Sequence, residues 1–520
     1  MPLAKTRSVA LVGVDGFVVD VEATITSGVP GLHLVGLPDA ALSEARDRVR
    51  AAIFNSGETW PNRHVTVSLF PASLPKKGSS FDVAIAVSLL AAADAVSPAA
   101  CTGLVMIGEL GLDGRIRAVP GVLPAVLAAV NARCGTVVVP RANAPEAELV
   151  PGVKVIPVST LRALMCHLRG EPPPLPEEDD DPVATGPSPD GLTVRGRSRR
   201  ADLDLADVRG QADARHALEV SAAGGHHLCF SGPPGCGKTM LAERLPTLLP
   251  PLEPTAALEV TAIHSVAGTL PPGRPLITEA PFYAPHHTAT TAAMVGGGTG
   301  GRGIQPGAAS LAHHGVLFLD EAPEFQSGVL DALRQPLEDG EVMISRSGAN
   351  TRFPARFTLV LAANPCPCAA AKDVDCRCPP AVRHRYLSRI SGPLLDRIDL
   401  KLELQPATPA ELRYDLEFAE PSDTVAQRVQ LARERTAKRL AGTPWRTNAE
   451  IPGPELRRRF TPPAEAMGPV DRALRLGSLS ARGLDRVLRV AWTCADLAGR
   501  DQPADDDVGL ALDLWTGRRA

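Results

Sequence analysis

Residues 232–239 read Gly-Pro-Pro-Gly-Cys-Gly-Lys-Thr and fit the template G-x-x-x-x-G-K-[ST] at every fixed position. The short apolar run His227–Phe230 precedes this stretch, and the helix-forming run Met240–Leu245 follows it. A strand, a glycine-rich loop and a helix together bind phosphate, because backbone N–H groups surround the phosphate oxygens and the helix N-terminus adds partial positive charge. The motif therefore predicts a nucleotide site formed by Gly232, Pro233, Pro234, Gly235, Cys236, Gly237, Lys238 and Thr239.

Within that site the last two residues have separate roles. Lys238 is expected to reach the β- and γ-phosphates of ATP, and the hydroxyl of Thr239 is expected to hold Mg²⁺. A second run, Gly315–Glu321, is apolar and ends in two carboxylates, which is typical of a strand buried in a parallel sheet. We expect Asp320 to join the Mg²⁺ shell and Glu321 to polarise the attacking water, since phosphoryl transfer needs mainly positioning and electrostatics.

A third apolar run, Phe357–Ala363, ends at Asn364. An amide at the end of a strand beside the phosphate loop could orient the water that attacks. The alternative is an ordinary polar residue in a strand-terminal turn.

Composition limits the kind of protein this is. The chain has 520 residues, of which 44% are hydrophobic and 22% charged, and this predicts two to four domains with sizeable cores. No apolar run reaches the ~18 residues that span a bilayer, and no signal peptide is expected. Ten cysteines, four of them clustered, do not indicate a secreted disulfide scaffold, so we expect a cytoplasmic protein. The net charge of −4 means that any nucleic-acid surface must be local.

The chain changes character around residues 171–190, which are rich in proline and acidic residues and read as a linker. The basic stretch Arg195–Arg200 follows; a solvated tether is the favoured interpretation, and contact with DNA the alternative. Before the linker, β-rich runs at Thr6–Val12, Val65–Leu69, Gly103–Ile107 and Thr136–Val139 alternate with helical runs at Ala40–Asn55, Phe81–Ala93 and Val122–Ala132. This alternation predicts an α/β domain.

Four cysteines form the sharpest secondary motif: Cys366, Cys368, Cys376 and Cys378. Four thiolates within so short a stretch suit a closed tetrahedral zinc site, although C-x-C is tighter than the usual C-x₂-C spacing. Disulfides, a redox switch or free thiols are the alternatives. The paired histidines His286–His287 also suggest a metal, but they have no ligand partner at suitable spacing nearby.

These motifs, in this order, resemble an AAA+ ATPase of the pre-sensor-1 hairpin clade, and more closely the magnesium-chelatase-like competence ATPase family. The stretches Leu34–Asp39, Leu311–Glu321 and Asn364–Cys368 are close to signatures of that family. The resemblance covers essentially the whole chain. It implies an α/β fold, with a parallel-sheet P-loop core, a C-terminal helical lid and an N-terminal Lon-protease-like domain. We expect domains at 1–168, 201–410 and 411–520, a linker at 169–200 and a four-cysteine insertion at 366–378.

The resemblance also suggests roles for single residues. Ser80 falls in register with the nucleophilic serine of Lon proteases, but the lysine position is Leu123, so we expect a peptidase fold without peptidase chemistry and Ser80 as a helix N-cap. The glycine-rich stretch 296–303 reads as a loop inserted into a helix, which in this clade points into a central pore. Strands at 341–346 and 351–357 predict a hairpin that places Arg346 near its tip, where it would contact DNA phosphates; a solvated edge arginine is the alternative.

Two arginines are assigned by position in the family. Arg397 matches the arginine finger, which reaches the γ-phosphate bound to a neighbouring subunit. Arg389 is the second candidate for this role. The alternative is that Arg397 only forms an ion pair with Asp396 or Asp399. The helical stretch 479–488 resembles the second sensor helix of the family, and Arg482 would contact the nucleotide phosphate there. Arg486 and Arg489 are weaker candidates. The alternative is a helix face whose arginines are only solvated.

Studied members of the family are DNA branch-migration helicases. The resemblance therefore implies an ATPase that assembles into a homo-hexameric ring, with DNA in its central pore, and drives branch migration of incoming DNA during natural transformation. Its cofactors would be ATP, Mg²⁺ and a structural Zn²⁺, and no membrane is involved. A magnesium-chelatase motor, an ATP-dependent Lon-like protease and a nucleotide-binding switch without mechanical output are the alternatives.

Overall fold

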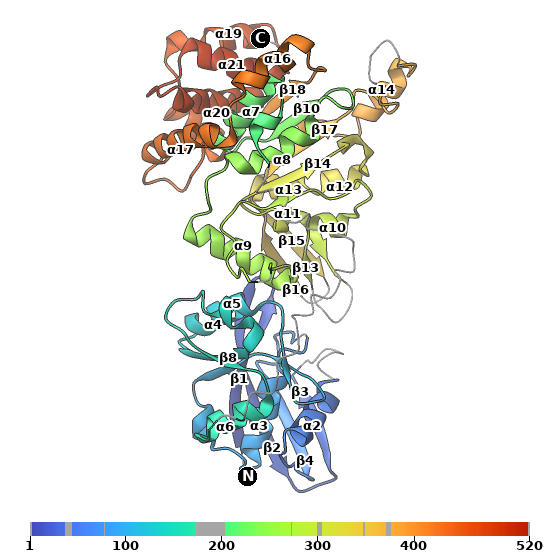
Figure 1. Cartoon of the computed structure of the whole chain (residues 1–520), viewed down its shortest axis with the longest axis vertical. Helices are drawn as coiled ribbons and strands as arrows, with labels where there is room; N and C mark the ends of the chain where they lie inside the picture. Colours follow the sequence, from blue (N-terminus) through green and yellow to red (C-terminus); the bar gives the residue numbers. More distant parts are fainter. Residues whose placement is uncertain are drawn as a thin grey trace.

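The computed structural model describes residues 3–36, 44–76, 78–172, 174, 203–271, 273–298, 304–346, 349–370 and 376–517. The chain is elongated, with the N-terminal unit at one end of the long axis and the C-terminal helices at the other (Figure 1). Parts of several predicted segments lie outside the described residues: 37–39 of the first signature, most of the linker (175–200), 299–303 of the glycine-rich stretch, the hairpin turn 347–348, and 371–375 between the cysteine pairs.

The N-terminal unit is built on a mixed seven-stranded sheet. Its strands, in spatial order, are β3 (Gly31–Val35), β4 (His64–Phe70), β2 (Asp15–Thr26), β1 (Leu3–Val12), β5 (Leu104–Met106), β8 (Thr136–Pro140) and β9 (Lys154–Val158). The four predicted strands are present as β1, β4, β5 and β8. Helix α3 (Asp82–Ala92) is buried along its entire length, which explains its continuous apolar sequence.

A second sheet has five strands that all run parallel. Their order is β11 (Phe282–Tyr283), β14 (Val316–Leu319), β17 (Thr358–Ala363), β10 (Leu228–Ser231) and β18 (Leu400–Glu403). The predicted strands before the phosphate loop, before the Asp-Glu pair and before Asn364 are therefore neighbours in one sheet. All four residues of β14 are buried, as expected for a parallel sheet covered on both faces.

Between β10 and β17 the chain adds the elements that the sequence indicated as insertions. Helix α10 (Thr291–Val295) leads into β12 (Gly296–Gly297), which pairs with β13 (Gln305–Pro306), and α11 (Ala308–Leu311) follows. The predicted hairpin is β15 (Glu341–Arg346) with β16 (Ala349–Pro354). Its second strand begins at Ala349, earlier than the sequence analysis placed it, because Arg346 pairs directly with Ala349.

The C-terminal part is helical, as predicted. It comprises α16 (Pro409–Phe418), α17 (Ser422–Arg439), α18 (Gly453–Arg458), α19 (Gly468–Arg475), α20 (Ala481–Leu497) and α21 (Asp505–Thr516). The buried face of α17 contains Val425, Val429 and Ala432, whereas Leu431 is 52% exposed. The sequence alone predicts an apolar stripe at Val425, Val429, Leu431 and Leu440. Leu431 does not belong to it, because it lies only two residues from Val429 and positions two apart do not share a helix face. Among the helices described, none has both the length and the hydropathy needed to cross a bilayer.

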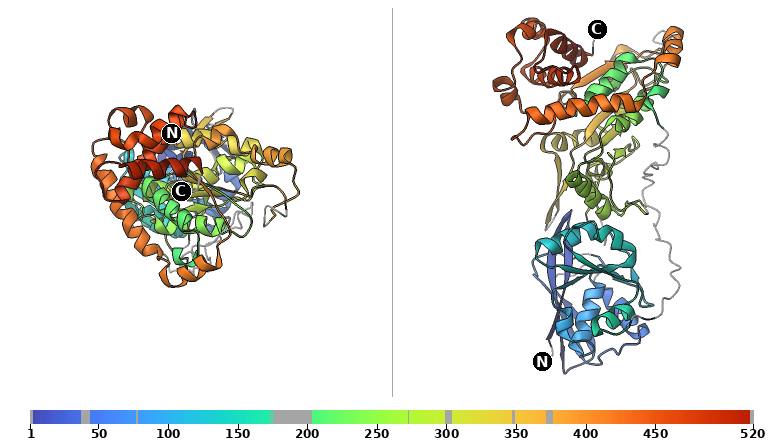
Figure 2. Two further views of the ribbon diagram at one scale, coloured as in Figure 1. Left: turned by 90° about the horizontal axis from the view of Figure 1, so that it is seen from above. Right: turned by 60° about the vertical axis from the view of Figure 1, so that its left-hand side comes forward.

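The N-terminal unit and the parallel-sheet unit are joined by direct contacts (Figure 2). Helix α4 (Val122–Asn131) packs on α9 (Pro254–Ala267), and the Gly121 N–H donates to the Ser265 carbonyl oxygen over 3.0 Å. The β1–β2 turn approaches β16 so closely that a Cβ on Gly13 would lie 2.6 Å from the Arg352 carbonyl oxygen. Gly13 also has a φ of 68°, so this approach requires glycine.

Candidate nucleotide site

The phosphate loop connects β10 to α8 (Lys238–Leu248), the strand-to-helix arrangement that its sequence predicted. Gly235 and Gly237 have φ values of 79° and 94°, a left-handed backbone that side chains disfavour. The buried Lys238 ammonium group donates to the carbonyl oxygens of Gly232 and Pro233 over 2.6 and 2.9 Å. The loop therefore curls around its own lysine at the N-terminus of α8, the end of a helix that attracts anions.

The three motifs of the sequence analysis converge on this loop. The Thr239 hydroxyl donates to a carboxylate oxygen of Asp320 over 2.8 Å. The Lys238 ammonium donates to the side-chain oxygen of Asn364 over 3.0 Å. Parallel strands have their carboxyl ends at one edge of the sheet, so the residues that follow β10, β14 and β17 must meet there. A hydroxyl beside a carboxylate is the kind of oxygen pair that Mg²⁺ prefers.

Glu321, the predicted catalytic base, lies next to this pair with its side chain half-exposed. Its backbone adopts φ 51° and ψ 44°, the left-handed region that non-glycine residues rarely occupy. The Glu321 N–H donates to Asp320 over 2.9 Å, and its carbonyl oxygen accepts from the Glu324 N–H over 2.7 Å. Backbone strain of this kind is typical of functional sites.

The two finger candidates contact residues of their own chain. The Arg397 side chain is only 12% exposed; it pairs with Glu338 and donates to the Pro393 carbonyl oxygen over 2.5 Å. The alternative pairing with Asp396 or Asp399 is therefore not what the structure contains. Arg389 donates to the Pro323 carbonyl oxygen over 3.1 Å, just beyond the Asp-Glu pair.

The three arginines of the predicted sensor helix differ in environment. Arg482 is exposed in the first turn of α20, where Ser480 caps the helix by accepting from the Gly483 N–H. Arg486 donates to the buried Asp399 over 2.9 Å, and Arg489 donates to the Ile451 carbonyl oxygen over 2.8 Å. Arg486 and Arg489 are thus committed to internal contacts, which leaves Arg482 as the arginine of this helix available to a ligand.

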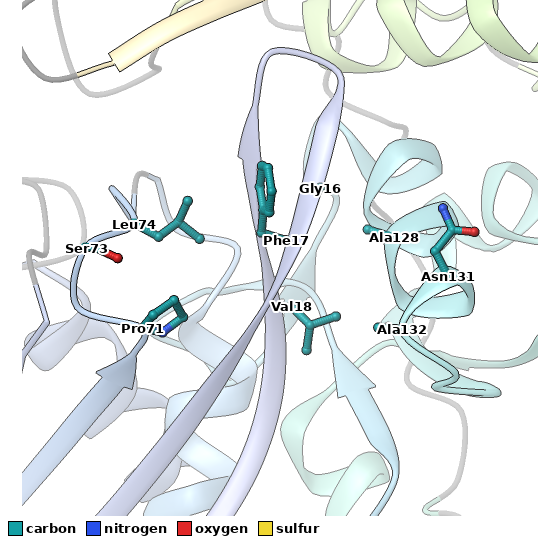
Figure 3. A pocket seen from close by; sticks show the side chains of 9 residues that line it. All are labelled: Gly16, Phe17, Val18, Pro71, Ser73, Leu74, Ala128, Asn131 and Ala132. Carbon is teal, nitrogen blue, oxygen red and sulfur yellow. The ribbon is translucent and has the colours of Figure 1, made fainter.

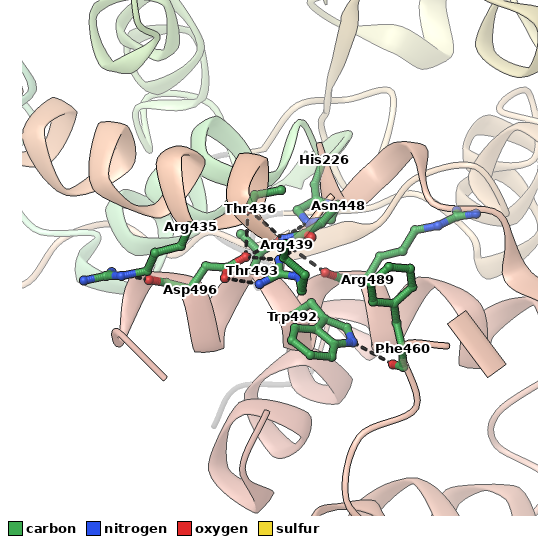
Figure 4. Close-up of polar contacts among 10 residues, drawn as sticks. All are labelled: His226, Arg435, Thr436, Arg439, Asn448, Phe460, Arg489, Trp492, Thr493 and Asp496. Atoms are coloured by element: carbon green, nitrogen blue, oxygen red, sulfur yellow. Dashed lines mark hydrogen bonds and ion pairs between the residues drawn. The ribbon is translucent and has the colours of Figure 1, made fainter. Parts of the chain in front are cut away.

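A buried polar network fixes the helical part to the strand before the phosphate loop (Figure 4). The ring of His226 bonds to the Thr493 hydroxyl over 2.7 Å, and the Asn448 amide donates to Thr493 and to Asp496 over 3.0 and 2.9 Å. Asp496 is also paired with Arg439, whose guanidinium lies 4.4 Å from the centre of the Trp492 ring. Movement of this helical part is therefore linked to β10, which begins two residues after His226.

Arg346, the predicted DNA contact, is the last residue of β15, at the tip end of the hairpin. Its side chain lies outside the described residues. Arg352 on the paired strand has a side chain that is 63% exposed. Both strands of the hairpin therefore carry an arginine, of which Arg352 was not singled out from the sequence.

Comparison with known proteins agrees with this geometry. The chain is 41% identical to YifB of Escherichia coli over 503 residues, covering 96% of this chain and 94% of YifB. It belongs to the YifB/ComM family of magnesium-chelatase-like proteins. It is also 40% identical over 512 residues to the competence protein ComM of Haemophilus influenzae, covering 98% and 97% of the two chains. An uncharacterised protein of Mycobacterium tuberculosis is 52% identical over the full length of both chains.

Family models divide the YifB/ComM-like chain into three parts. "Magnesium chelatase, subunit ChlI" matches residues 204–412, "Subunit ChlI of Mg-chelatase" matches 21–143, and "Magnesium chelatase, subunit ChlI C-terminal" matches 419–514. Part of the chain is also 31% identical, over 191 residues, to the Lon protease of Geobacter metallireducens, which covers 34% of this chain and 23% of that protease. The mixed α/β fold with a parallel-sheet core is thus that of the family, while the likeness to Lon is partial.

In the N-terminal unit of this YifB/ComM relative, Ser80 and Leu123 stand at the positions that the sequence analysis aligned with the serine and lysine of Lon proteases. Ser80 is not a helix N-cap, as the sequence analysis had expected, because α3 is preceded by Phe81 as its cap residue and receives no side-chain bond. The Ser80 carbonyl oxygen instead accepts from the Gly108 N–H over 3.0 Å. Leu123 is fully buried, and its N–H donates to Glu146 over 2.8 Å. Glu146 also accepts from the Ser265 hydroxyl, so Glu146 links the backbone of Leu123 to α9.

A hollow in the same unit lies beside the β1–β2 hairpin (Figure 3). Its lining is Gly16, Phe17, Val18, Pro71, Ser73, Leu74, Ala128, Asn131 and Ala132. None of these side chains titrates near neutral pH, so the hollow has no acid, base or thiolate to offer for catalysis.

The four cysteines of the insertion gather at one point. The sulfur atoms of Cys366 and Cys368 are 3.1 Å apart, and those of Cys366 and Cys376 are 3.3 Å apart. All four sulfurs lie within 4.8 Å of one another, a donor set that fits a tetrahedral Zn²⁺. Hydrogen bonds to its sulfur, of which the bond from the Cys378 backbone has the largest effect, lower the pKa of Cys376 to about 6. The lower pKa favours the thiolate, which is the form that zinc binds.

Glu259, His313 and His314 form a second group of potential metal ligands. The Nε2 atoms of His313 and His314 both lie 3.2 Å from Glu259 Oε2. However, the Nδ1 atom of His313 accepts from the Arg356 N–H over 2.9 Å. The proton of a neutral His313 must then sit on Nε2, where it is donated to Glu259, so this nitrogen has no lone pair for a metal. We therefore assign a structural role to these three residues, which connect α9 to the segment before β14.

Proposed function

We propose that the protein hydrolyses ATP at the loop 232–239 and, as a homo-hexameric ring in the cytoplasm, uses it to drive DNA strands through a central pore. The observation that carries the proposal is the meeting of four side chains at one sheet edge: Lys238 with Asn364 at 3.0 Å and Thr239 with Asp320 at 2.8 Å. A merely nucleotide-binding loop needs neither the amide nor the glutamate beside it. Their presence supports hydrolysis.

Each residue has a defined task in this proposal. Lys238 leaves the carbonyl oxygens of its loop to neutralise the terminal phosphates, Glu321 accepts the proton of the attacking water, and Asn364 orients that water. Thr239 and Asp320 would hold Mg²⁺, which supplies positive charge to the phosphate oxygens. Arg397 would stabilise the developing charge from the adjacent subunit, and Arg482 would contact phosphate from the lid.

DNA as the moving partner is supported by the family and by the hairpin. The Haemophilus influenzae relative is named a competence protein and resembles this chain over nearly its entire length. The studied family members suggest branch migration during recombination of incoming DNA. The hairpin β15–β16 carries arginines that can contact phosphates without reading sequence. We take 1–168 as a Lon-like domain without peptidase activity, 169–200 as a linker, 201–410 as the ATPase core and 411–520 as the lid.

We also propose a structural zinc at the four-cysteine insertion. Its place directly after Asn364 suggests that it braces the water-orienting residue. Burial raises the pKa of Tyr386 to about 12. The negative charges of Glu324, Glu321 and Cys366 raise it in the same direction. Tyr386 lies in α14 (Pro380–Leu387), immediately after the cysteines, so this segment also lies close to the proposed base.

A magnesium-chelatase motor is the second candidate, because the matching family models carry that description. By resemblance, a dedicated chelatase motor lacks the cysteine cluster and the Lon-like domain that we propose for residues 1–168, so we rank this candidate second. ATP-dependent proteolysis is disfavoured by Leu123.

The test is an ATPase assay without DNA, with single-stranded DNA and with a four-way junction. We expect DNA to stimulate turnover of the wild type and Arg346→Ala to lose that stimulation, whereas Arg475→Ala, an exposed arginine of α19, retains it. Glu321→Gln should bind nucleotide and turn over at least ~100-fold more slowly. Stimulation only by a chelatase partner with porphyrin would favour the second candidate, and unstimulated turnover in every condition would contradict both.

A further inference from the structure

The β1–β2 turn of the N-terminal unit lies against the hairpin β15–β16 of the parallel-sheet unit (Figure 1). A Cβ placed on Gly13, in that turn, would lie 2.6 Å from the Arg352 carbonyl oxygen and 2.9 Å from Cγ2 of Thr351. Gly13 itself is buried, and Val14 packs against the hydrophobic core of the parallel-sheet unit. The turn is therefore packed into the other unit, where it meets the strand that carries Arg352.

The hairpin has one packed face and one exposed face. Side chains of a strand alternate between its two faces, and residues directly opposite each other in an antiparallel pair share a face. The cross-strand pairs of the packed face are Ile344 with Thr351 and Val342 with Phe353. Arg352 lies on the other face, opposite Met343, and its side chain is 63% exposed. The turn thus contacts the packed side chain of Thr351, while the neighbouring arginine faces solvent.

The packed face of the hairpin is in contact with two different segments. Thr351 meets Gly13, as described above. Ile344, directly opposite Thr351, meets the glycine-rich insertion, because a Cβ on Gly296 would lie 2.9 Å from Cδ1 of Ile344. A two-stranded hairpin is only marginally stable by itself. Its orientation therefore depends on what its packed face rests against, and the N-terminal turn is one of these supports.

The turn is itself anchored to the parallel-sheet unit. Gly121, which precedes α4, lies between β1 and α9, and a Cβ there would collide with the side chain of Leu11. Its N–H donates to the Ser265 carbonyl oxygen of α9 over 3.0 Å. Helix α9 also packs against β13, the second strand of the glycine-rich insertion. The N-terminal unit thus contacts the hairpin directly and reaches the insertion through α9.

We propose that the β1–β2 turn positions the hairpin β15–β16 for contact with DNA phosphates, which gives the N-terminal unit a function as a brace of the DNA-contacting strands. This inference rests on the proposed function, because it takes the hairpin as a DNA contact. The turn and Arg352 lie on opposite faces of a thin two-stranded ribbon. Displacement of the turn therefore changes where the guanidinium of Arg352 lies, while the proposed catalytic residues keep their places.

The experiment compares two glycine variants of the full-length protein. Gly13→Ala places a methyl group against the Arg352 carbonyl oxygen. Gly152→Ala is the matched control. The φ values of Gly13 and Gly152 are 68° and 78°, so both variants carry the strain of a side chain in left-handed backbone, but nothing lies within 4 Å of a Cβ on Gly152. Binding of a fluorescein-labelled single-stranded oligonucleotide is measured with a non-hydrolysable ATP analogue at several salt concentrations. Hydrogen exchange of the backbone amides 341–354 is measured without DNA.

For Gly13→Ala we expect the Kd for the oligonucleotide to rise about three- to tenfold relative to Gly152→Ala. The slope of log affinity against log salt should become shallower by about 0.7 for each phosphate contact that is lost. Amides 341–354 should exchange faster in Gly13→Ala, because the hairpin loses part of its support. Unstimulated kcat and the KM for ATP should equal those of Gly152→Ala, since the change acts on the hairpin.

Val14→Ala is a second test, because it weakens the same contact without backbone strain. It should show the same pattern with smaller amplitude, and it carries the comparison if melting curves show that Gly13→Ala does not fold. Its control is Val153→Ala, a half-buried valine elsewhere in the N-terminal unit.

Equal Kd values for Gly13→Ala and Gly152→Ala would overturn the inference, and so would equal exchange of amides 341–354. A fall in unstimulated turnover for Gly13→Ala alone would also overturn it, because the turn would then support the nucleotide site. Failure of the proposed function has a different signature. In that case the wild type binds no oligonucleotide at any salt concentration, and the exchange comparison still decides whether the turn holds the hairpin.

Discussion

At the scale of single residues, two histidines that precede strands β10 and β14, at the end of the sheet opposite the nucleotide site, make stability depend on pH. Burial lowers the pKa of His227 to about 4, and its Nδ1 atom accepts from the Leu359 N–H over 3.0 Å, which a protonated nitrogen could not do. Burial also lowers the pKa of His314 to about 4. Both folded-state values lie below the ordinary value of 6.5, so the unfolded chain takes up protons first as the pH falls.

We therefore predict that the stabilisation from these two rings is fully present above pH 6.5 and is lost as the pH falls from there to about 4. Denaturant midpoints measured across this range should fall for the wild type. His227→Asn keeps an acceptor near the Nδ1 position without a titrating ring, so its midpoint should fall less steeply. A wild-type midpoint that stays constant from pH 7 to 4 would contradict the prediction.

Which side-chain contacts can be predicted from the sequence depends on whether both residues follow recognisable motifs. Lys238, Thr239, Asp320 and Asn364 follow recognisable strands, and the parallel sheet forces the ends of those strands together. The contacts His287–Glu321, Arg397–Glu338 and Arg486–Asp399 could not be predicted, because each joins side chains from different elements whose rotamers are chosen by packing. No periodicity or motif reports such pairs.

At the scale of elements, the four-cysteine insertion should depend on metal. We predict one Zn²⁺ per chain in protein purified without chelator, and loss of that zinc in Cys376→Ser and Cys378→Ser. Because structural zinc contributes to folding, both variants should melt several degrees lower, and ATP turnover should fall since Asn364 precedes the insertion directly. Cys166→Ser, in the N-terminal unit, is the control that should keep the metal. Zinc-free protein with wild-type melting would exclude the site.

Helix α4 gives a second prediction at this scale. Leu123 is fully buried in an apolar cluster that also contains Val9, Val105 and Val122. Leu123→Lys, which introduces the lysine of Lon proteases, replaces this buried apolar side chain with a charged one and should cost about 3 kcal/mol or more. We expect a lower melting temperature and no hydrolysis of casein. Leu123→Met, which conserves volume, should cost less than about 1.5 kcal/mol. Casein cleavage by the lysine variant that a serine-reactive inhibitor blocks would show that the peptidase site is still intact.

The elements themselves were largely predictable, because each has its own hydrophobic period. The exceptions follow from local geometry. The stripe on α17 passes through Ala432 rather than Leu431, since the 3.6-residue period outweighs side-chain hydrophobicity. Ser80 lies one residue too early to cap α3, because the helix begins only after Phe81. The joint between α4 and α9 left no sequence signal. Its hydrogen bonds involve backbone groups and the buried carboxylate of Glu146, and its apolar part, which includes Ala262 of α9, has no motif of its own.

At the scale of the whole molecule, one chain does not complete its proposed site. Arg397 is paired with Glu338 of α13 (Arg334–Asp339), and among the contacts described none joins it to the phosphate loop of its own chain. In the proposed ring, head-to-tail interfaces would bring Arg397 of one subunit to the nucleotide of the next, and an arginine in that position would raise the rate about 10³-fold or more. Each of two variants should therefore be inactive alone. Lys238→Ala loses the binding of ATP, and Arg397→Ala loses the positive charge that stabilises the transition state.

Mixing these two variants distinguishes the arrangements. With random assembly, about a quarter of the interfaces pair an intact Lys238 with an intact Arg397, so the mixture should recover about a quarter of wild-type turnover. A mixture of Lys238→Ala with Glu321→Gln should recover nothing, because both residues belong to the same half of the site. ATPase rates measured after nucleotide-dependent assembly, with ring formation followed by light scattering, give the answer. No recovery in the first mixture, although mixed rings form, would place the arginine in its own subunit's site and remove the physical reason for a ring.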